Sequence, residues 1–190
     1  MKAVLLNGSP RAKGNTFDAL SVVKAELTDR GIDAEIVQLG GNVYSGCRAC
    51  GGCGKNKNRK CVITDDKMND IFEKVFEADA VVIGSPTYFS NVTTEVKAFI
   101  DRCGFVGRAN GGLLKHKVGA PVVIARRCGA NFVYSAINYF FGICEMTIAT
   151  STYWNMVLAG AEGSINEDLE GVETLKTLGE NIARLLLAKY

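Results

Sequence analysis

Four closely spaced cysteines are the residues with the clearest capacity for chemistry. Cys47, Cys50, Cys53 and Cys61 form a C-x2-C-x2-C-x7-C run within the segment SGCRACGGCGKNKNRKC. Thiolates at this spacing can ligate zinc or an iron–sulfur cluster, pair as disulfides, or act as free redox groups. The glycines among them allow the backbone to turn tightly around one bound centre. The spacing by itself leaves all of these uses open.

A polar, glycine-containing loop near the amino terminus has the residue types that bind a phosphate. It reads NGSPRAKGNT and ends at Thr16. Between a strand and a helix, its backbone N–H groups and the positive end of the helix dipole suit an anion. Ser9, Arg11, Asn15 and Thr16 add hydroxyl, guanidinium and amide donors. Asn15 stands where a Walker A loop needs lysine, so a nucleoside triphosphate is disfavoured. A plain turn with an Asn or Thr cap is the alternative.

Two later loops carry side chains that suit a flat, aromatic ligand. The segment GSPTYFSN, from Gly84 to Asn91, offers two aromatic rings and several backbone donors. The segment ARRCGAN places Arg126 and Arg127 where positive charge could stabilise an anionic ring. The alternatives are aromatic rings that fill the core and a solvated arginine pair. We expect Cys128, in the same segment, to be a buried structural thiol.

The elements that must position these loops alternate between strand-like and helix-like patterns. The expected strands are Lys2–Leu6, Ala34–Leu39, Ala80–Gly84, Val118–Ala125 and Met146–Ala149, and the expected helices are Thr16–Asp29, Thr64–Phe76, Val92–Cys103, Asn131–Gly142 and Glu167–Ala188. Strict alternation predicts an α/β fold, with a parallel sheet covered by helices on both faces. We expect a flavodoxin-like, doubly wound, five-stranded sheet of order 2-1-3-4-5, with a cysteine-rich loop, residues 45–63, inserted after strand 2. The three ligand loops then meet at the carboxyl ends of the strands.

Composition excludes several classes of protein. A length of 190 residues predicts a single domain, 1–190, and 47% hydrophobic with 22% charged residues suits a globular core. The formal net charge of +2 is too small to indicate nucleic acid or a membrane surface as a partner. No apolar run has the length of a membrane span or an export signal, so we expect a cytoplasmic protein. In that compartment, clustered cysteines are more often metal ligands or redox groups than disulfides.

Taken together, the loops resemble those of a known family. N-G-S-P-R-x-x-G-N-T after a first strand, and S-P-x-Y before a K-x-F-x-D-R helix at Lys97–Arg102, resemble the NADPH-dependent FMN reductase group of the flavodoxin-like fold. The resemblance implies that FMN places its phosphate in the first loop. It also implies that FMN is bound by Ser9, Arg11, Asn15, Thr16, Pro86, Thr87, Tyr88, Phe89, Asn91 and Arg126.

The cysteine run resembles one branch of this group, the iron–sulfur flavoproteins. That resemblance implies a 4Fe–4S cluster on Cys47, Cys50, Cys53 and Cys61, with electron transfer that couples one- and two-electron steps. A single cubane suits closely spaced thiolates, whereas zinc more often uses two separated C-x2-C pairs. The implied partners are NAD(P)H or a ferredoxin, and the implied assembly is a homodimer or homotetramer. The alternatives are a cluster-free NAD(P)H-dependent FMN or quinone reductase, whose loop holds zinc or nothing, and a flavin-based redox sensor.

Overall fold

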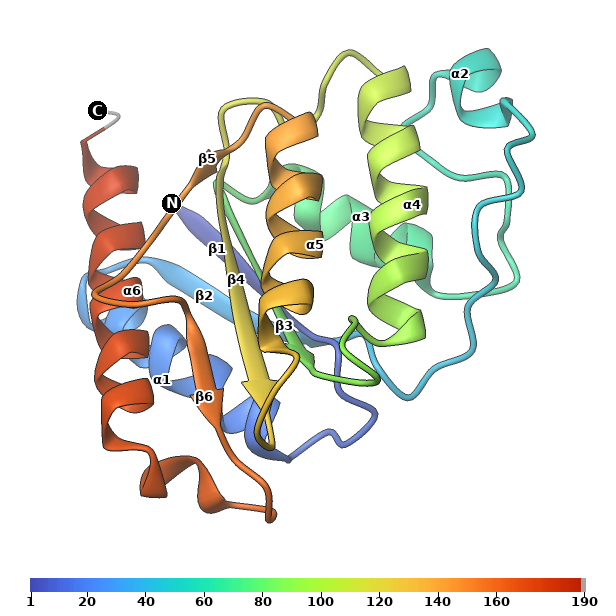
Figure 1. Ribbon diagram of the computed structural model, residues 1–190. Helices are drawn as coiled ribbons and strands as arrows, with labels where there is room; N and C mark the ends of the chain where they lie inside the picture. Colours follow the sequence, from blue (N-terminus) through green and yellow to red (C-terminus); the bar gives the residue numbers. More distant parts are fainter. Residues whose placement is uncertain (189–190) are drawn as a thin grey trace.

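The computed structural model describes residues 1–188, which are built around one twisted parallel sheet (Figure 1). The strands are β1 (Lys2–Asn7), β2 (Asp33–Gln38), β3 (Ala80–Pro86), β4 (Val118–Ala125), β5 (Thr147–Ile148) and β6 (Met156–Leu158). They are hydrogen-bonded in the order β2-β1-β3-β4-β5, with β6 also paired to β4, and every pairing is parallel. The predicted order 2-1-3-4-5 is confirmed.

The edge of the sheet beside β4 differs from the expected single fifth strand. β5 pairs with the start of β4, and β6 pairs with its last three residues. The polar residues between them leave the ladder, because buried Asn155 supplies substitute bonds. Its side chain accepts from Ser151 Oγ at 2.5 Å and donates to Ala149 O at 3.4 Å. Residues Met156–Leu158 then return the chain to the carboxyl end of the sheet.

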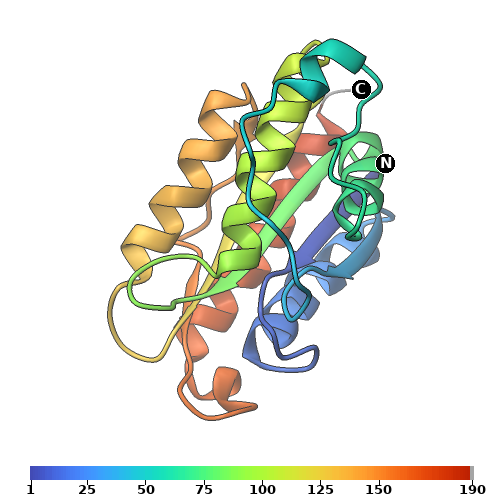
Figure 2. The same ribbon diagram turned by 90° about the vertical axis from the view of Figure 1, so that its right-hand side faces the viewer.

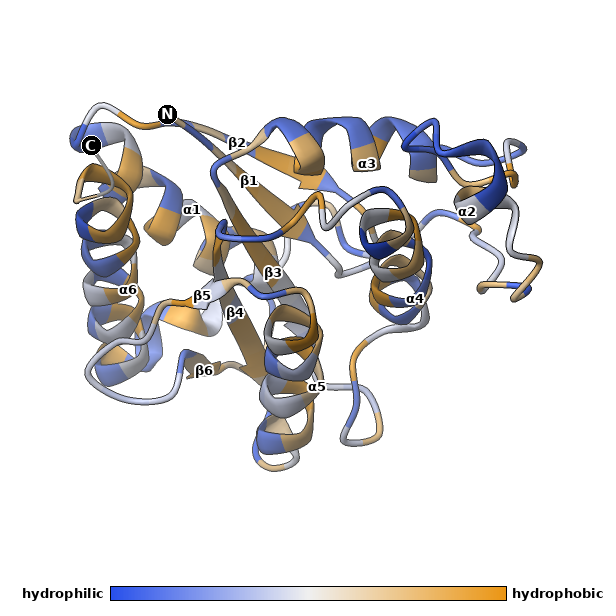
Figure 3. Ribbon diagram, turned by 90° about the horizontal axis from the view of Figure 1, so that it is seen from above, coloured by the Kyte–Doolittle hydropathy of each residue, from blue (hydrophilic) through white to orange (hydrophobic). Residues whose placement is uncertain are grey.

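Helices cover both faces of the sheet, as alternation predicted (Figure 3). α1 (Asn15–Asp29) and α6 (Leu169–Leu187) pack on one face, while α3 (Met68–Glu77), α4 (Thr94–Ala109) and α5 (Ala130–Ile143) pack on the other. Successive residues of β1 point into the two cores: Val4 and Leu6 into one, Ala3 and Leu5 into the other. This alternation is what a strand buried on both faces requires. None of the helices within residues 1–188 combines the length and the apolar character that a membrane crossing needs.

Two helices on the face that carries the cysteine segment begin or end away from their expected limits. α3 starts at Met68 rather than Thr64, with Lys67 at the N-cap, and Asp66 in the preceding turn accepts a hydrogen bond from Met68 N at 3.0 Å. α4 starts at Thr94, because the hydroxyl of Thr93 caps it. It continues to Ala109, well past Cys103, because buried Val106 extends its apolar face. This added length supplies one wall for the cysteine segment.

The cysteine segment follows β2 and runs beside α4. Both side-on views show residues 41–51 passing along that helix to a short helix, α2 (Gly52–Asn56), at its far end (Figures 1 and 2). This short helix was not expected. It begins after Gly51, whose φ of 70° is in the left-handed region that glycine adopts readily. A short 3-10 helix, η1 (Ser164–Glu167), precedes α6.

Candidate functional site

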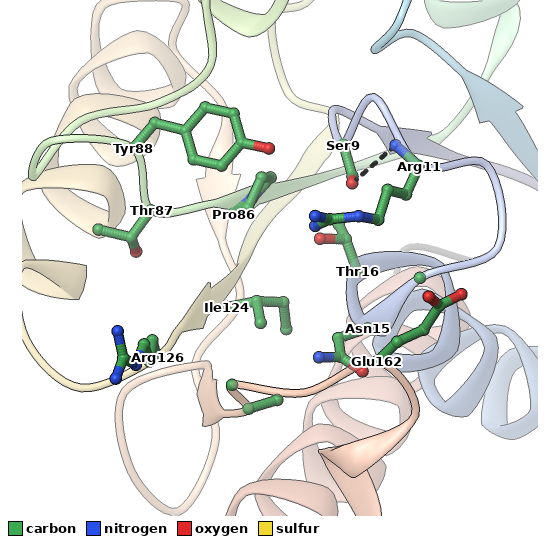
Figure 4. A pocket seen from close by; sticks show the side chains of 13 residues that line it. Ser9, Arg11, Asn15, Thr16, Pro86, Thr87, Tyr88, Ile124, Arg126 and Glu162 are labelled. Carbon is green, nitrogen blue, oxygen red and sulfur yellow. Dashed lines mark hydrogen bonds between the residues drawn. The ribbon is translucent and has the colours of Figure 1, made fainter.

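A pocket of about 230 Å³ opens at the carboxyl ends of β1, β3, β4 and β6. Eight of the residues proposed from sequence line it: Ser9, Arg11, Asn15, Thr16, Pro86, Thr87, Tyr88 and Arg126 (Figure 4). Five further lining residues were not proposed: Gly14, Ile124, Ala159, Gly160 and Glu162. Three of these lie just after β6, the strand that sequence patterning missed. Phe89 and Asn91 do not line the pocket.

The loop between β1 and α1 is held in place by the amides of buried Asn7 and partly buried Gln38. Asn7 Oδ1 accepts from Ser9 N at 3.1 Å, and Asn7 Nδ2 donates to Gln38 Oε1 at 2.7 Å. Gln38 Nε2 in turn donates to Ser9 O at 2.7 Å. Gly8 lies so close to β3 that an added Cβ would stand 2.6 Å from Gly84 O. The loop is therefore a preformed cradle, and its shape is set by residues that do not themselves line the pocket.

The amino-terminal end of α1 suits an anion. Gly14 occupies the N-cap position, and no side chain makes a capping hydrogen bond there. The helix dipole and the first backbone N–H groups are therefore directed at the pocket with no competing side chain. The buried hydroxyl-bearing residues Ser9 and Thr16 and the guanidinium of Arg11 stand around the same end. This arrangement has the donors and the positive charge that a phosphate ester requires.

Asn15 joins two walls of the pocket. Its Nδ2 donates to Ala161 O at 2.7 Å, and its Oδ1 accepts from Gly163 N at 2.9 Å. The sequence suggested that this amide donates to a phosphate; in the structure its oxygen and one of its two N–H groups hold the segment after β6. That segment includes Glu162, the one carboxylate in the pocket lining. Asn15 therefore fixes the position of a wall that is almost 150 residues away along the chain.

The opposite wall is a tight hairpin after β3. Thr87 N donates to Ile124 O at 2.7 Å, and the backbones of Tyr88 and Asn91 exchange two hydrogen bonds of 2.9 Å. Phe89 and Ser90 at the tip have positive φ angles of 47° and 59°, and the Phe89 side chain is fully exposed. The hairpin thus presents Tyr88 to the pocket and directs Phe89 away from it.

Polar groups on this wall fit the edge of a flat heterocycle. The hydroxyl oxygen of Thr87 is buried and has no hydrogen-bond partner within residues 1–188. Such groups are rare in folded proteins and indicate a missing partner. Figure 4 places Arg126 on the same side of the pocket as Thr87, with Arg11 and the first loop on the other. Arg126 lines the pocket, whereas Arg127 does not.

A second cavity, of about 140 Å³, lies between the cysteine segment and α4, and all four clustered cysteines line it. None of them forms a disulfide; Cys50 is exposed and the other three are partly buried. The remaining wall is largely apolar and includes Ile63 and Phe105. The volume is several times the ~30 Å³ that one water molecule occupies in the liquid. Within residues 1–188, no three metal-ligating side chains gather closely enough around one point to hold a single ion.

Neighbouring helices fix the cysteine segment at several points. Asn69 of α3 accepts from Cys61 N at 2.8 Å and donates to Cys61 O at 3.0 Å. Asn110, which follows α4, accepts from Arg59 N at 3.0 Å and donates to Cys53 O at 3.4 Å. Cys47 Sγ accepts from Ala49 N at 3.5 Å. The donor set, the room and the N–H directed at sulfur all fit a polynuclear iron–sulfur centre.

The other three cysteines lie outside both cavities. Cys103 and Cys144 are buried, and burial raises the pKa of the Cys103 thiol well above its usual value, with a smaller contribution from nearby Cys144. The expectation that Cys128 is buried was wrong, because the loop after β4 exposes it to solvent. These thiols belong to neither candidate site.

The chain is similar to known flavoproteins along most of its length. A family model described as NADPH-dependent FMN reductase matches residues 1–160. The chain is 31% identical to an iron–sulfur flavoprotein of Methanocaldococcus jannaschii, over 98% of this chain and 97% of that protein. It is 36% identical to an iron–sulfur flavoprotein of Archaeoglobus fulgidus, over 97% and 95% of the two chains.

Solved structures show the same architecture at low sequence identity. A flavodoxin from the domain Archaea superposes with a TM-score of 0.64 at 17% identity, and the match covers 100% of both chains. A flavone reductase superposes with a TM-score of 0.74 at 17% identity, over 100% of this chain and 65% of the other. At this identity, the likeness extends to the fold and no further.

Proposed function

The chain belongs to the NADPH-dependent FMN reductase family and, within it, to the iron–sulfur flavoproteins, and from this premise we propose that it couples one-electron to two-electron transfer. FMN supplies two-electron chemistry, and a 4Fe–4S cluster supplies one-electron chemistry. The observation that carries the proposal is that four free thiols line one cavity while a separate pocket, lined by donors that suit an anion, opens at the carboxyl edge of the sheet.

In the pocket, we assign the phosphate of FMN to the first loop. The uncapped start of α1, Ser9 and Thr16 supply hydrogen-bond donors, and Arg11 supplies charge. Asn15 holds the wall after β6 through Oδ1 and one of the two hydrogens on Nδ2, and we assign the other hydrogen to the phosphate. Glu162 on that wall places a negative charge in the pocket. We infer that it disfavours ligands with a second phosphate, because like charges at close range repel.

We assign the flavin ring to the side lined by Pro86, Thr87 and Tyr88. The partnerless hydroxyl of Thr87 can donate to or accept from a polar edge of the ring, and half-exposed Tyr88 can cover its face. Arg126 adds positive charge that favours a reduced, anionic ring. Phe89 and Asn91 act through the hairpin: Asn91 closes it, and Phe89 extends from its tip.

The two sites lie at different ends of α4. The hairpin of the pocket precedes the start of the helix, whereas the cysteine cavity contacts Arg102, Phe105 and Val106. At a rise of 1.5 Å per residue, the separation along the helix from Thr93 to Val106 is about 20 Å. We therefore propose that a homodimer or homotetramer brings the cysteine cavity of one copy near the pocket of another.

The surface around the cysteine cavity suits an acidic redox partner. Lys55, Lys57, Arg59 and Lys60 are exposed on the turn between Cys53 and Cys61. A ferredoxin presents carboxylates, whose negative charge complements these cations. It also carries one electron at a time, as a 4Fe–4S cluster does. NAD(P)H is the corresponding two-electron donor at the pocket. We propose that the protein exchanges electrons with a ferredoxin at the cysteine cavity or with NAD(P)H at the pocket.

The test is to purify the protein without oxygen and to measure FMN, iron and acid-labile sulfide per chain. We expect one FMN with about four irons and four sulfides. Replacing Cys50 with Ala should remove the iron and sulfide and leave FMN bound. The matched control is Cys128→Ala, which changes a thiol outside both cavities and should retain everything. FMN without sulfide in the wild-type protein would instead indicate a cluster-free reductase.

A further inference from the structure

One helix carries a charged side chain in the interior of the protein. Arg102, on α4, is the largest of the fully buried side chains in residues 1–188, with 1% of its surface exposed. A guanidinium keeps its charge under all ordinary conditions, so its burial is costly unless every donor finds a partner. The partners of Arg102 therefore show what the buried charge serves.

Four of the five N–H groups of Arg102 hold the segment around the cysteines. Nη1 donates to Ser45 O at 3.3 Å and to Asp66 Oδ2, and Nη2 donates to Ile63 O at 3.2 Å and to Asp66 Oδ1 at 3.1 Å. Ser45 precedes the first clustered cysteine, and Ile63 and Asp66 follow the last. These bonds account for both hydrogens on each Nη and leave only the hydrogen on Nε.

The fifth donor is unused within the described chain. Arg102 Nε is buried and has no hydrogen-bond partner among residues 1–188. Arg102 also lines the cysteine cavity, together with all four clustered thiols. A buried N–H at the wall of a cavity of thiols indicates a partner that belongs in the cavity, since native proteins rarely leave such a donor unpaired.

Among the thiols, Cys61 lies beside a backbone group that Arg102 binds. Ile63 follows Cys61 by two residues, and its carbonyl oxygen accepts from Arg102 Nη2 at 3.2 Å. Cys61 is also the cysteine whose backbone is held by Asn69 on both its N–H and its carbonyl. Its position relative to Arg102 is therefore fixed by the two helices that flank it.

We propose that Nε–H of Arg102 donates a hydrogen bond to the sulfur of Cys61 when that sulfur ligates the cluster, and thereby raises the reduction potential of the cluster. This rests on the proposed function. No bond is made or broken, and Arg102 keeps its proton. One-electron reduction adds negative charge to the ligating sulfurs, and a charge-assisted hydrogen bond stabilises that charge more in the reduced state than in the oxidised state.

A purely structural role for Arg102 has different consequences. If Arg102 only held the segment, Arg102→Lys would lose cluster with no change in the potential of the clusters that remain. Under the proposal, Arg102→Lys lowers that potential, whereas Asp66→Asn, which loosens the same segment, does not lower it. Arg102→Lys removes the donor and leaves the Asp66 carboxylate in place. Asp66→Asn retains the donor and removes a negative charge near the cavity.

The experiment uses the anaerobically purified wild-type protein labelled with 15N at Nε of arginine. Electron–nuclear double resonance of the reduced cluster should show coupling to one 15N nucleus. Two arginines line the cavity, Arg48 and Arg102. Arg48→Lys is therefore the matched control and should retain the coupling, whereas Arg102→Lys should lose it. We also expect the equilibrium constant for reduction to fall about tenfold in Arg102→Lys, which is about 59 mV for a one-electron couple.

Each outcome either supports or refutes the hydrogen bond from Arg102 to the cluster ligand. A wild-type cluster without the 15N coupling, or a coupling that persists in Arg102→Lys, would overturn the role of Arg102. If Arg102→Lys assembles no cluster, the wild-type protein and Arg48→Lys still decide: coupling in both supports Arg102, and absence in both refutes it. A wild-type protein without iron and sulfide would refute the proposed function itself, and so is distinguishable from failure of this inference.

Discussion

Replacing Thr87 with Val should weaken FMN binding and, at the same time, raise the stability of the flavin-free protein. The hydroxyl oxygen of Thr87 is buried without a partner within residues 1–188, and Val keeps the shape of the side chain. An unsatisfied buried polar group costs about 1–3 kcal/mol, so the flavin-free protein should become more stable by about 1 kcal/mol. For a chain of 190 residues, that is a rise in Tm of about 2–4 °C.

The same substitution should weaken FMN binding. A hydrogen bond between Thr87 and the ring contributes about 0.5–1.5 kcal/mol, so its loss raises the Kd about 2- to 12-fold. The assays are calorimetric unfolding of the deflavinated protein and fluorescence titration with FMN. Thr87→Ser is the control, because it retains the hydroxyl and should keep the wild-type Kd. An unchanged Kd in Thr87→Val, or a lower Tm of the flavin-free protein, would refute the reasoning.

Three further substitutions or treatments test other parts of the structure. Asn15→Ala should release the wall after β6 and speed FMN dissociation about tenfold, because two hydrogen bonds are lost; an unchanged rate in a stopped-flow experiment would contradict this. Gly8→Ala should lower the free energy of unfolding by about 1–3 kcal/mol in urea, because the new Cβ would stand 2.3 Å from a valine methyl of α4. Gly142→Ala, where nothing lies within 4 Å, is the control and should not destabilise the protein. Burial raises the pKa of Cys103, so at pH 8 an alkylating reagent should label exposed Cys128 in the folded protein and reach Cys103 only after unfolding, as mass spectrometry would show. Since folded Cys103 holds its proton more tightly than the unfolded chain does, its contribution to stability is complete below pH ~8.5 and declines as the pH rises further.

Much of the fold follows from short-range patterns. The limits of β4 agree residue for residue with the expectation, because Val118–Ala125 is a continuous apolar run that can be buried only in the middle of a sheet. The loop after β1 was recognised because a strand, a glycine-containing turn and a helix start adjoin in sequence. By contrast, β6 is three residues long and carries no periodic signal, so its place beside β4 was missed. The pocket residues that follow β6 were missed for the same reason: Ala159, Gly160 and Glu162.

The types and spacing of the residues were enough to group the four cysteines, which line one cavity, and to predict an anion site in the first loop, because both features lie within a few consecutive turns of chain. The role of Asn15 and the burial of Arg102 were decided only by tertiary structure. Asn15 reaches Ala161, and Arg102 reaches Ser45 and Asp66, across separations that no local pattern records. A polar side chain on a helix has the same sequence signature whether it faces solvent or a cavity. Its partners are chosen by how the helices pack on the sheet, and that packing depends on the whole core at once.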